Sequence, residues 1–148
     1  MVSQLVASKA IISRKLSPCS DRHGAGVTTI QANPHRDHQV LTGSYDEHAR
    51  LWDARNWARP VAELRAPGGV WRCKWHPRDA DRAVLGCMHS GFCTVRVTDG
   101  SALRLEARHD AHQSLAYGVD WHWASDTVAS CSFYDCRVHV WSAEAATA

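Results

Sequence analysis

The sequence predicts an all-β protein made of about three repeats of one antiparallel sheet, and three observations support this prediction. Sequence segments recur at a fixed spacing, strand-like runs recur within each repeat, and turn-forming Gly, Pro, Asn and Asp separate the runs. The 148 residues suit a single domain, and 45% hydrophobic with 22% charged residues is typical of a globular chain. Seven Trp and ten His add large flat anchors and groups that titrate near neutrality.

The repeat is visible in short segments that agree on the same offsets. Trp75-His76-Pro77 and Trp121-His122-Trp123 are 46 positions apart, and Asn33-Pro34 lies 43 positions before His76-Pro77. The combined offset of 89 positions relates Asp46 to Asp135 and Trp52 to Trp141. A period of ~40–45 residues with Trp-Asp at the end of a strand is typical of WD40 blades, and Trp52-Asp53 supplies that ending. The sequence therefore predicts a WD40 β-propeller.

Each repeat contains strand-like runs in the same order. We expect strands at 27–31, 39–43, 48–52 and 61–65 in the first unit, at 70–75, 82–87, 92–97 and 102–106 in the second, and at 116–121, 127–132 and 137–141 in the third. The third unit lacks a fourth run. The repeat region 23–148 accordingly divides into blades at about residues 23–65, 66–108 and 109–142.

The number of blades is too small for a closed ring. Propellers typically close with about four to eight blades, so we expect an incomplete propeller that corresponds to the last three blades of a longer one. Residues 1–22 form a divergent N-terminal tail with five Ser and no acidic residue before Asp21. This composition is compatible with a transit peptide, but we favour a tail that is not part of a blade.

Charge and hydropathy exclude two classes of partner. The net charge is only +2 and the 14 Arg are interspersed with acids, so there is no basic stripe for nucleic acid. No run approaches the ~18 apolar residues of a membrane-spanning helix, so we expect no membrane association. The six Cys lie mostly within strand-like runs, which favours a reducing, cytoplasmic compartment over a disulfide-rich secreted domain.

A zinc site is the alternative use of the cysteines. Two sets could supply ligands, namely Cys87, His89 and Cys93, or Cys131, Cys136 and His139. Neither set has the paired C-x-x-C spacing of a structural zinc site, so we expect no metal and no cofactor.

Beyond the repeat itself, five segments resemble one particular WD-repeat family, the diphthine methylesterases. They are Thr42–His48, Gly68–Arg72 with Lys74–Pro77, Cys87–Phe92, Ser114–Gly118 with Asp120-Trp121, and Cys131–Asp135, within about residues 23–142. The resemblance implies a propeller that hydrolyses the methyl ester of diphthine. That ester is an intermediate in converting one His of translation elongation factor 2 to diphthamide, so elongation factor 2 is the implied protein substrate.

Candidate catalytic residues lie on the turns that share one face of the predicted propeller. In the second unit His89 stands at the position of Asp46 and Asp135, and Val95 stands at that of the blade Trp. We expect His89 to act as a general base, Ser90 as a nucleophile, and Asp46, Asp135 or Asp110 to orient the imidazole. The N–H groups of Gly68 and Gly69 could stabilise the oxyanion, and His109 or His112 would be the alternative base.

Structural interpretations of the same residues remain open. A turn Asp usually bonds its own backbone, His89 could reflect drift of the repeat, and Ser90 could be a plain turn residue before Gly91.

Candidate substrate-binding residues flank the same turns. The substrate implied by the resemblance carries a quaternary ammonium group, which aromatic faces and carboxylates attract. We expect Tyr45, Glu47, Tyr134 and Asp110 to bind it, with Phe92 nearby, whereas Trp71, Trp75, Trp121 and Trp123 are expected to pack in the core. A non-catalytic scaffold that binds a partner protein, or an inactive truncated form of the esterase, is the competing interpretation.

Overall fold

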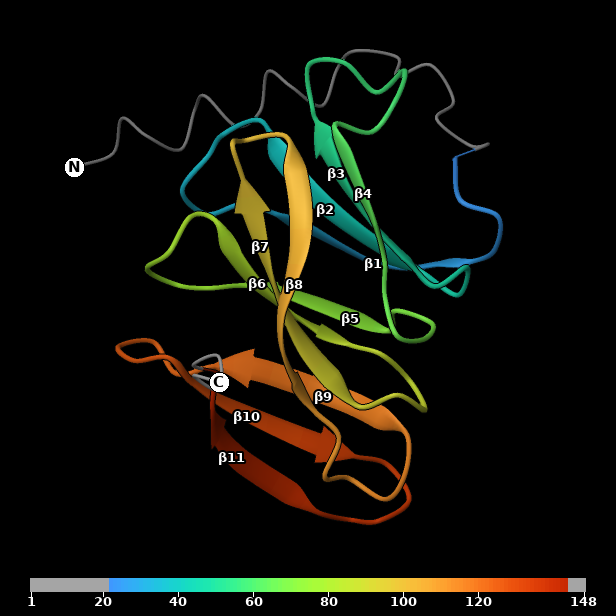
Figure 1. Cartoon of the computed structure of the whole chain (residues 1–148), viewed down its shortest axis with the longest axis vertical. Helices are drawn as coiled ribbons and strands as arrows, with labels where there is room; N and C mark the ends of the chain where they lie inside the picture. Colours follow the sequence, from blue (N-terminus) through green and yellow to red (C-terminus); the bar gives the residue numbers. More distant parts are fainter. Residues whose placement is uncertain (1–21, 144–148) are drawn as a thin grey trace, which may run out of the picture.

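The computed structural model describes residues 22–143, so the expected tail at 1–22 lies, apart from Arg22, outside the described residues. The first sheet contains β1 (Val27–Ala32), β2 (Gln39–Ser44), β3 (His48–Asp53) and β4 (Ala62–Arg65). The second contains β5 (Arg72–Trp75), β6 (Arg82–Gly86), β7 (Phe92–Thr98) and β8 (Ala102–His109). The third contains β9 (Ala116–Trp121), β10 (Thr127–Ser132) and β11 (Val138–Ser142). Figure 1 shows the three sheets side by side in chain order.

Each sheet is an antiparallel meander, which confirms the predicted fold class of an incomplete WD40 propeller. The strands match the expected runs with small differences at the ends. β5 starts at Arg72 and not at residue 70, because the Val70 N–H bonds the Ser44 carbonyl of the first sheet. β8 continues to His109, which pairs with Phe92, so His109 ends a strand and does not lie in the following loop as expected. The residues described contain no helix, and hence none that could cross a bilayer.

The sheets pack face to face, and two Trp residues perform the same function one repeat apart. Trp75 Nε1 donates to the carbonyl of Gln31 (3.1 Å), and Trp121 Nε1 donates to that of Lys74 (3.0 Å). Both indoles are buried, as expected from their shared offset. The expectation for the other two Trp was wrong: Trp71 is half-buried in the segment before β5, and Trp123 is 76% exposed in the turn after β9.

The middle sheet has an apolar core on each of its faces. Successive side chains of a strand point to opposite faces, so Leu85 packs toward the first sheet and Val84 toward the third. Val95 joins the first cluster and Phe92 the second, and all four side chains are fully buried. Phe92 is therefore a core residue and is not available at the turn, contrary to the expectation that it would flank the substrate.

The third sheet ends at an open strand within residues 22–143. β11 pairs with β10 only, and its Val138 and Val140 are each 70% exposed. This agrees with the missing fourth run of the third unit.

Gly43 on β2 tests the close contact between the first two sheets. A Cβ at this position would collide with Val70 Cγ1 and lie 2.9 Å from Thr29 Cγ2. We expect Gly43→Ala to lower the free energy of unfolding by ~1–3 kcal/mol, because the neighbouring sheet must shift. Gly26→Ala is the control, since its Cβ would meet only Tyr45 Cδ2 at an ordinary 3.5 Å. Equal urea midpoints for the two variants would contradict this packing.

Candidate active site

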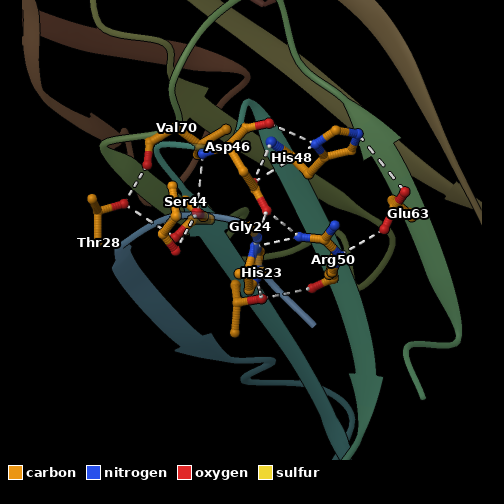
Figure 2. A network of polar contacts seen from close by, with 12 residues as sticks. His23, Gly24, Thr28, Ser44, Asp46, His48, Arg50, Glu63 and Val70 are labelled. Carbon is orange, nitrogen blue, oxygen red and sulfur yellow. Dashed lines mark hydrogen bonds and ion pairs between the residues drawn. The ribbon is translucent and has the colours of Figure 1, made fainter. Parts of the chain in front are cut away.

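The best-connected carboxylate of the first sheet belongs to Asp46, in the β2–β3 turn. It accepts hydrogen bonds from Arg50 Nη1 (2.7 Å) and from the N–H groups of Gly24 (2.9 Å) and His48 (3.0 Å), and His23 Nδ1 lies 3.0 Å away. Figure 2 shows Asp46 at the centre of this network, with Arg50 reaching on to Glu63. The network joins the segment before β1 to β3 and β4.

The surroundings of Asp46 favour its ionised form. Burial by itself would raise the pKa of this carboxyl, but the hydrogen bonds from Arg50, Gly24 and His23 outweigh it and hold the pKa well below its ordinary value. Burial lowers the pKa of His23, and the charge of Arg50 adds to this effect. Asp46 is thus a charged group held by several donors.

A hydroxyl completes this arrangement in both outer sheets. In the first sheet, Thr42 Oγ1 lies 2.8 Å from His23 Nε2 and accepts a 2.8 Å hydrogen bond from Trp52 Nε1. In the third sheet, Ser130 Oγ lies 3.0 Å from His112 Nε2 and accepts a 3.1 Å bond from Trp141 Nε1.

The Ser130–His112–Asp135 chain has the order of a hydrolytic triad but not its accessibility. His112 Nδ1 lies 3.1 Å from Asp135, whose carboxylate also accepts from the N–H groups of Gln113 and Arg137. Ser130 is only 2% exposed, and its oxygen is occupied by the indole of Trp141. Because a nucleophile must reach its substrate, this buried chain stabilises the blade and does not attack esters.

The second sheet lacks all four members of this arrangement. At the offset of 43 positions, Ala66, Leu85, His89 and Val95 replace His23, Thr42, Asp46 and Trp52. The strand register agrees, since Leu85 pairs with Cys93 as Thr42 pairs with Arg50. Three of the replacements are buried and apolar, whereas His89 is exposed. The middle blade thus has an apolar interior and a free imidazole at its turn.

His89 lies at the tip of the β6–β7 turn. Its side chain makes no hydrogen bond or ion pair with any other residue in the described part of the chain. The turn itself is well anchored, because the Met88 carbonyl accepts from the Ala116 N–H (2.7 Å) and the Ser90 N–H donates to Cys87 (2.8 Å). His89 is therefore an accessible base on a fixed loop.

Ser90 is half-buried next to Gly68 of the β4–β5 loop. A Cβ on Gly68 would lie 2.8 Å from Ser90 Oγ and 2.9 Å from the Cys87 carbonyl, so only glycine permits this approach. The Gly68 N–H approaches the Cys87 thiol and favours its thiolate form. Gly69, beside Met88, has no N–H partner among residues 22–143 and remains a candidate donor.

The three Asp residues considered as partners of the base lie in different places. Asp46 and Asp135 are bound to His23 and His112, and neither hydrogen-bonds His89. Asp110 is exposed beside the turn, since a Cβ on Gly91 would lie 2.9 Å from Asp110 Cα. The structure brings Ser90, Gly68 and Asp110 to the His89 turn and leaves Asp46 and Asp135 in their own networks.

The expected substrate-binding side chains are largely exposed. Tyr45 is 47% and Tyr134 is 74% exposed, and Asp110 is exposed as well. Glu47 is half-buried and accepts a 3.1 Å hydrogen bond from Arg65.

Neither zinc set considered from the sequence is grouped in the structure. Within residues 22–143, the side chains close enough to share a metal ion are instead His109, His112 and His139. His112 has both ring nitrogens engaged by Asp135 and Ser130, and its ring stacks on that of His139 at 3.9 Å. The five described cysteines are free thiols.

Comparison with known proteins identifies the family. The sequence matches the WD40 family, described as WD domain, G-beta repeat, at residues 15–53 and 104–142. The chain belongs to the WD40 family. The two matched segments contain the Asp–His–hydroxyl–Trp arrangements of the two outer sheets, together with β1–β3 and β9–β11.

Relatives of this WD40 chain confirm the resemblance inferred from the five segments. Human diphthine methyltransferase is 47% identical over 108 residues, covering 70% of this chain and 24% of the human protein. A diphthine methyltransferase homolog of Dictyostelium discoideum is 35% identical over 128 residues, covering 78% of this chain and 35% of that protein. The chain thus spans only about a quarter to a third of the length of these relatives.

The propeller fold is also found among solved structures. A chain in the crystal structure of a mitotic checkpoint complex superimposes with a TM-score of 0.71, covering 82% of this chain and 37% of that one. The identity is 16%, so this likeness concerns the fold alone.

Sequence reasoning missed several WD40 residues at this face. His23 and Arg50 were not singled out, although their positions before β1 and four residues after Asp46 could have indicated them. Trp71 was assigned to the core because of its spacing from Trp75. Its position two residues after Gly69 was the available signal that it lies at the loop face.

The histidines of the WD40 blades make stability depend on pH. Burial lowers the pKa of both His23 and His109 below 6.5, and for His109 the charges of His139 and His112 add to this. A lowered pKa in the folded state means that the stabilisation is present above about pH 6.5 and is lost as the pH falls below it. We expect a lower melting temperature at about pH 5.5 than at about pH 7.5.

A substitution at His109 isolates part of this dependence. His109 stacks on Trp141 at 4.6 Å, and Phe can keep that stack without titrating. The decrease in melting temperature on acidification should be smaller in His109→Phe than in the unmodified chain. An unchanged pH dependence would show that His109 does not contribute.

Proposed function

We propose that this chain is part of a propeller that hydrolyses the methyl ester of diphthine on translation elongation factor 2, a cytoplasmic step of diphthamide biosynthesis. The relatives named diphthine methyltransferase support the substrate. The observation that supports a reaction centre is the middle blade, where an exposed His89 replaces the hydrogen-bonded carboxylate of its neighbours.

His89 acts in this proposal as the general base. It removes a proton from a water molecule or from the Ser90 hydroxyl, and the resulting oxygen attacks the ester carbonyl carbon. The carbon–methoxy bond breaks, the methoxide takes the proton back from the imidazolium, and methanol leaves. Attack by water gives the free carboxylate directly. Attack by Ser90 gives an ester of the Ser90 oxygen, which a water molecule then hydrolyses to the carboxylate and the free Ser90 hydroxyl. The Gly69 N–H is the donor available to the developing oxyanion.

The three Asp carboxylates have different roles in this proposal. Asp110 is exposed beside the turn and is the candidate to orient the His89 imidazole. Asp46 and Asp135 act as positioning residues, because their networks fix the turns that carry Tyr45 and Tyr134. Glu47 and the two tyrosines contact the substrate side chain.

The test is incubation of the protein with methylated elongation factor 2 in oxygen-labelled water. Hydrolysis predicts loss of the methyl group by mass spectrometry, release of methanol, and label in the new carboxylate. Transfer of the methyl group to another acceptor would give neither methanol nor label in the carboxylate. An unchanged ester with a folded protein would contradict the proposal.

The second candidate is a non-catalytic scaffold that binds a partner protein. The observation in its favour is the amount of exposed apolar surface on the outer sheets, which includes Ile30 at 62% and Val138 at 70%. Tight binding of elongation factor 2 without turnover would support it.

A further inference from the structure

Five aromatic side chains form a continuous row that runs from the β2–β3 turn, through the segment before β5, to β9 and the β10–β11 turn. Ring centroids are separated by 5.9, 5.7, 5.3 and 4.8 Å along the series Tyr45, Trp71, Tyr117, Phe133 and Tyr134. The two end contacts are edge-to-face and the two central ones are tilted. Each ring therefore touches the next, and the series forms one surface.

The row is exposed although it is held in place. Tyr117 is 37%, Phe133 55% and Tyr134 74% exposed, while Trp71 is half-buried. The backbone around it is bonded: the Trp71 N–H donates to Gly86 (2.8 Å) and the Phe133 N–H donates to Leu115 (3.2 Å). A rigid aromatic surface that faces solvent indicates a binding site, because exposed apolar area of this kind is otherwise unfavourable.

The composition of the row indicates the chemistry of its ligand. It contains no aliphatic side chain, and aromatic faces attract cations through their quadrupole. The three tyrosine hydroxyls are the only groups of these five side chains that can accept a hydrogen bond, so the row suits a cation that has no N–H to satisfy. The half-buried carboxylate of Glu47 lies two residues from Tyr45.

We propose that this aromatic row, with Trp71 and Tyr117 at its centre, binds a quaternary ammonium group. The inference rests on the proposed function and deepens it, since it assigns the residues that hold the charged group of the substrate. It also identifies Trp71, Tyr117 and Phe133 as binding residues.

The row passes beside the candidate base. Gly69 lies between Tyr45 of the row and Met88 of the β6–β7 turn, because a Cβ on Gly69 would be 3.6 Å from Tyr45 Cα and 2.6 Å from Met88 Sδ. On the other side, Ala116 next to Tyr117 bonds the Met88 carbonyl. A ligand with its ammonium on Trp71 can therefore place a neighbouring ester at the His89 turn.

The test compares choline with its neutral isostere, in which a tert-butyl group replaces the trimethylammonium group. The full 148-residue chain is titrated with each compound, and saturable Trp fluorescence changes are measured. The row predicts a response to choline that is ~2- to 30-fold tighter than the response to the isostere, the range expected for a cation–π contact.

Substitutions locate the site. Trp71→Leu should weaken choline binding by a similar ~2- to 30-fold, measured by calorimetry, whereas Trp71→Phe should retain most of it. Trp123→Leu is the matched control, since Trp123 is an exposed Trp outside the row and contacts His122. Melting curves identify any variant that is unfolded, and the choline-to-isostere ratio of the unmodified chain decides the question without any variant.

Each outcome bears on a different proposal. Equal affinity for choline and the isostere, or no saturable binding of choline, would overturn the assignment of the row. Choline binding that depends on Trp71 but occurs without ester hydrolysis would leave the row established and contradict the proposed esterase. Ester hydrolysis without preference for choline over the isostere would support the proposed esterase and overturn the assignment of the row.

Discussion

Replacement of His89 by Ala is expected to slow hydrolysis of the diphthine methyl ester by ~10²–10⁴-fold, the usual scale for the loss of a general base. The melting temperature should hardly change, because the exposed His89 side chain makes no hydrogen bond or ion pair within residues 22–143. The rate is measured by methanol release under single-turnover conditions, and stability by thermal melting of the same sample.

Two further variants make the His89 result specific. His38→Ala is the control, because His38 is an exposed histidine in the β1–β2 connection, at the opposite end of the strands. Ser90→Ala separates the two forms of attack, since a water mechanism survives it and a covalent one does not. If His89→Ala turns over fully and unfolds early, His89 is structural, and His109 would be the better candidate for the base.

Replacement of Asp46 by Ala is expected to lower the free energy of unfolding by ~3–5 kcal/mol, the cost of breaking a buried ion pair. The Asp46 carboxylate is only 10% exposed and binds Arg50, Gly24 and His48. Its removal leaves Arg50 Nη1 and two N–H groups without this acceptor, while Arg50 Nε still donates to Glu63. Urea unfolding followed by Trp fluorescence measures the effect.

The control for Asp46→Ala is Asp37→Ala, which removes an exposed carboxylate from the β1–β2 connection. It should change the free energy of unfolding by less than ~0.5 kcal/mol. Asp46→Asn should lie between the two, because the amide oxygen can still accept hydrogen bonds but carries no charge. A small effect of Asp46→Ala, together with a large loss of turnover, would instead assign this carboxylate to the reaction.

The strands could be predicted because their signals are local. Val27, Val40 and Phe92 each begin or lie in a run of β-forming residues bounded by turn residues, so the meander follows from patterns within a few positions. The repeat offset also indicated that Trp75 and Trp121 occupy equivalent positions. Their hydrogen bonds to the carbonyls of Gln31 and Lys74 confirm this.

The partners of the turn residues could not be predicted in the same way. His23 lies 23 positions before Asp46, as His112 lies 23 positions before Asp135, but this recurrence does not by itself show that the two side chains meet. Trp71 and Trp75 are four positions apart, but β5 begins only at Arg72, so the alternation that would place both indoles on one face does not apply to Trp71.

The sequence by itself therefore determined the repeat, the strand order and the replacement of the blade carboxylate by His89, because these depend on residue types at fixed spacing. Only the tertiary structure decided which groups are accessible. The packing of one sheet against the next buries Ser130 and Asp135 with His112 and leaves His89 exposed. The same packing aligns Tyr45 of the β2–β3 turn, Trp71 of the segment before β5 and Tyr117 of β9, which meet only when the blades stand face to face.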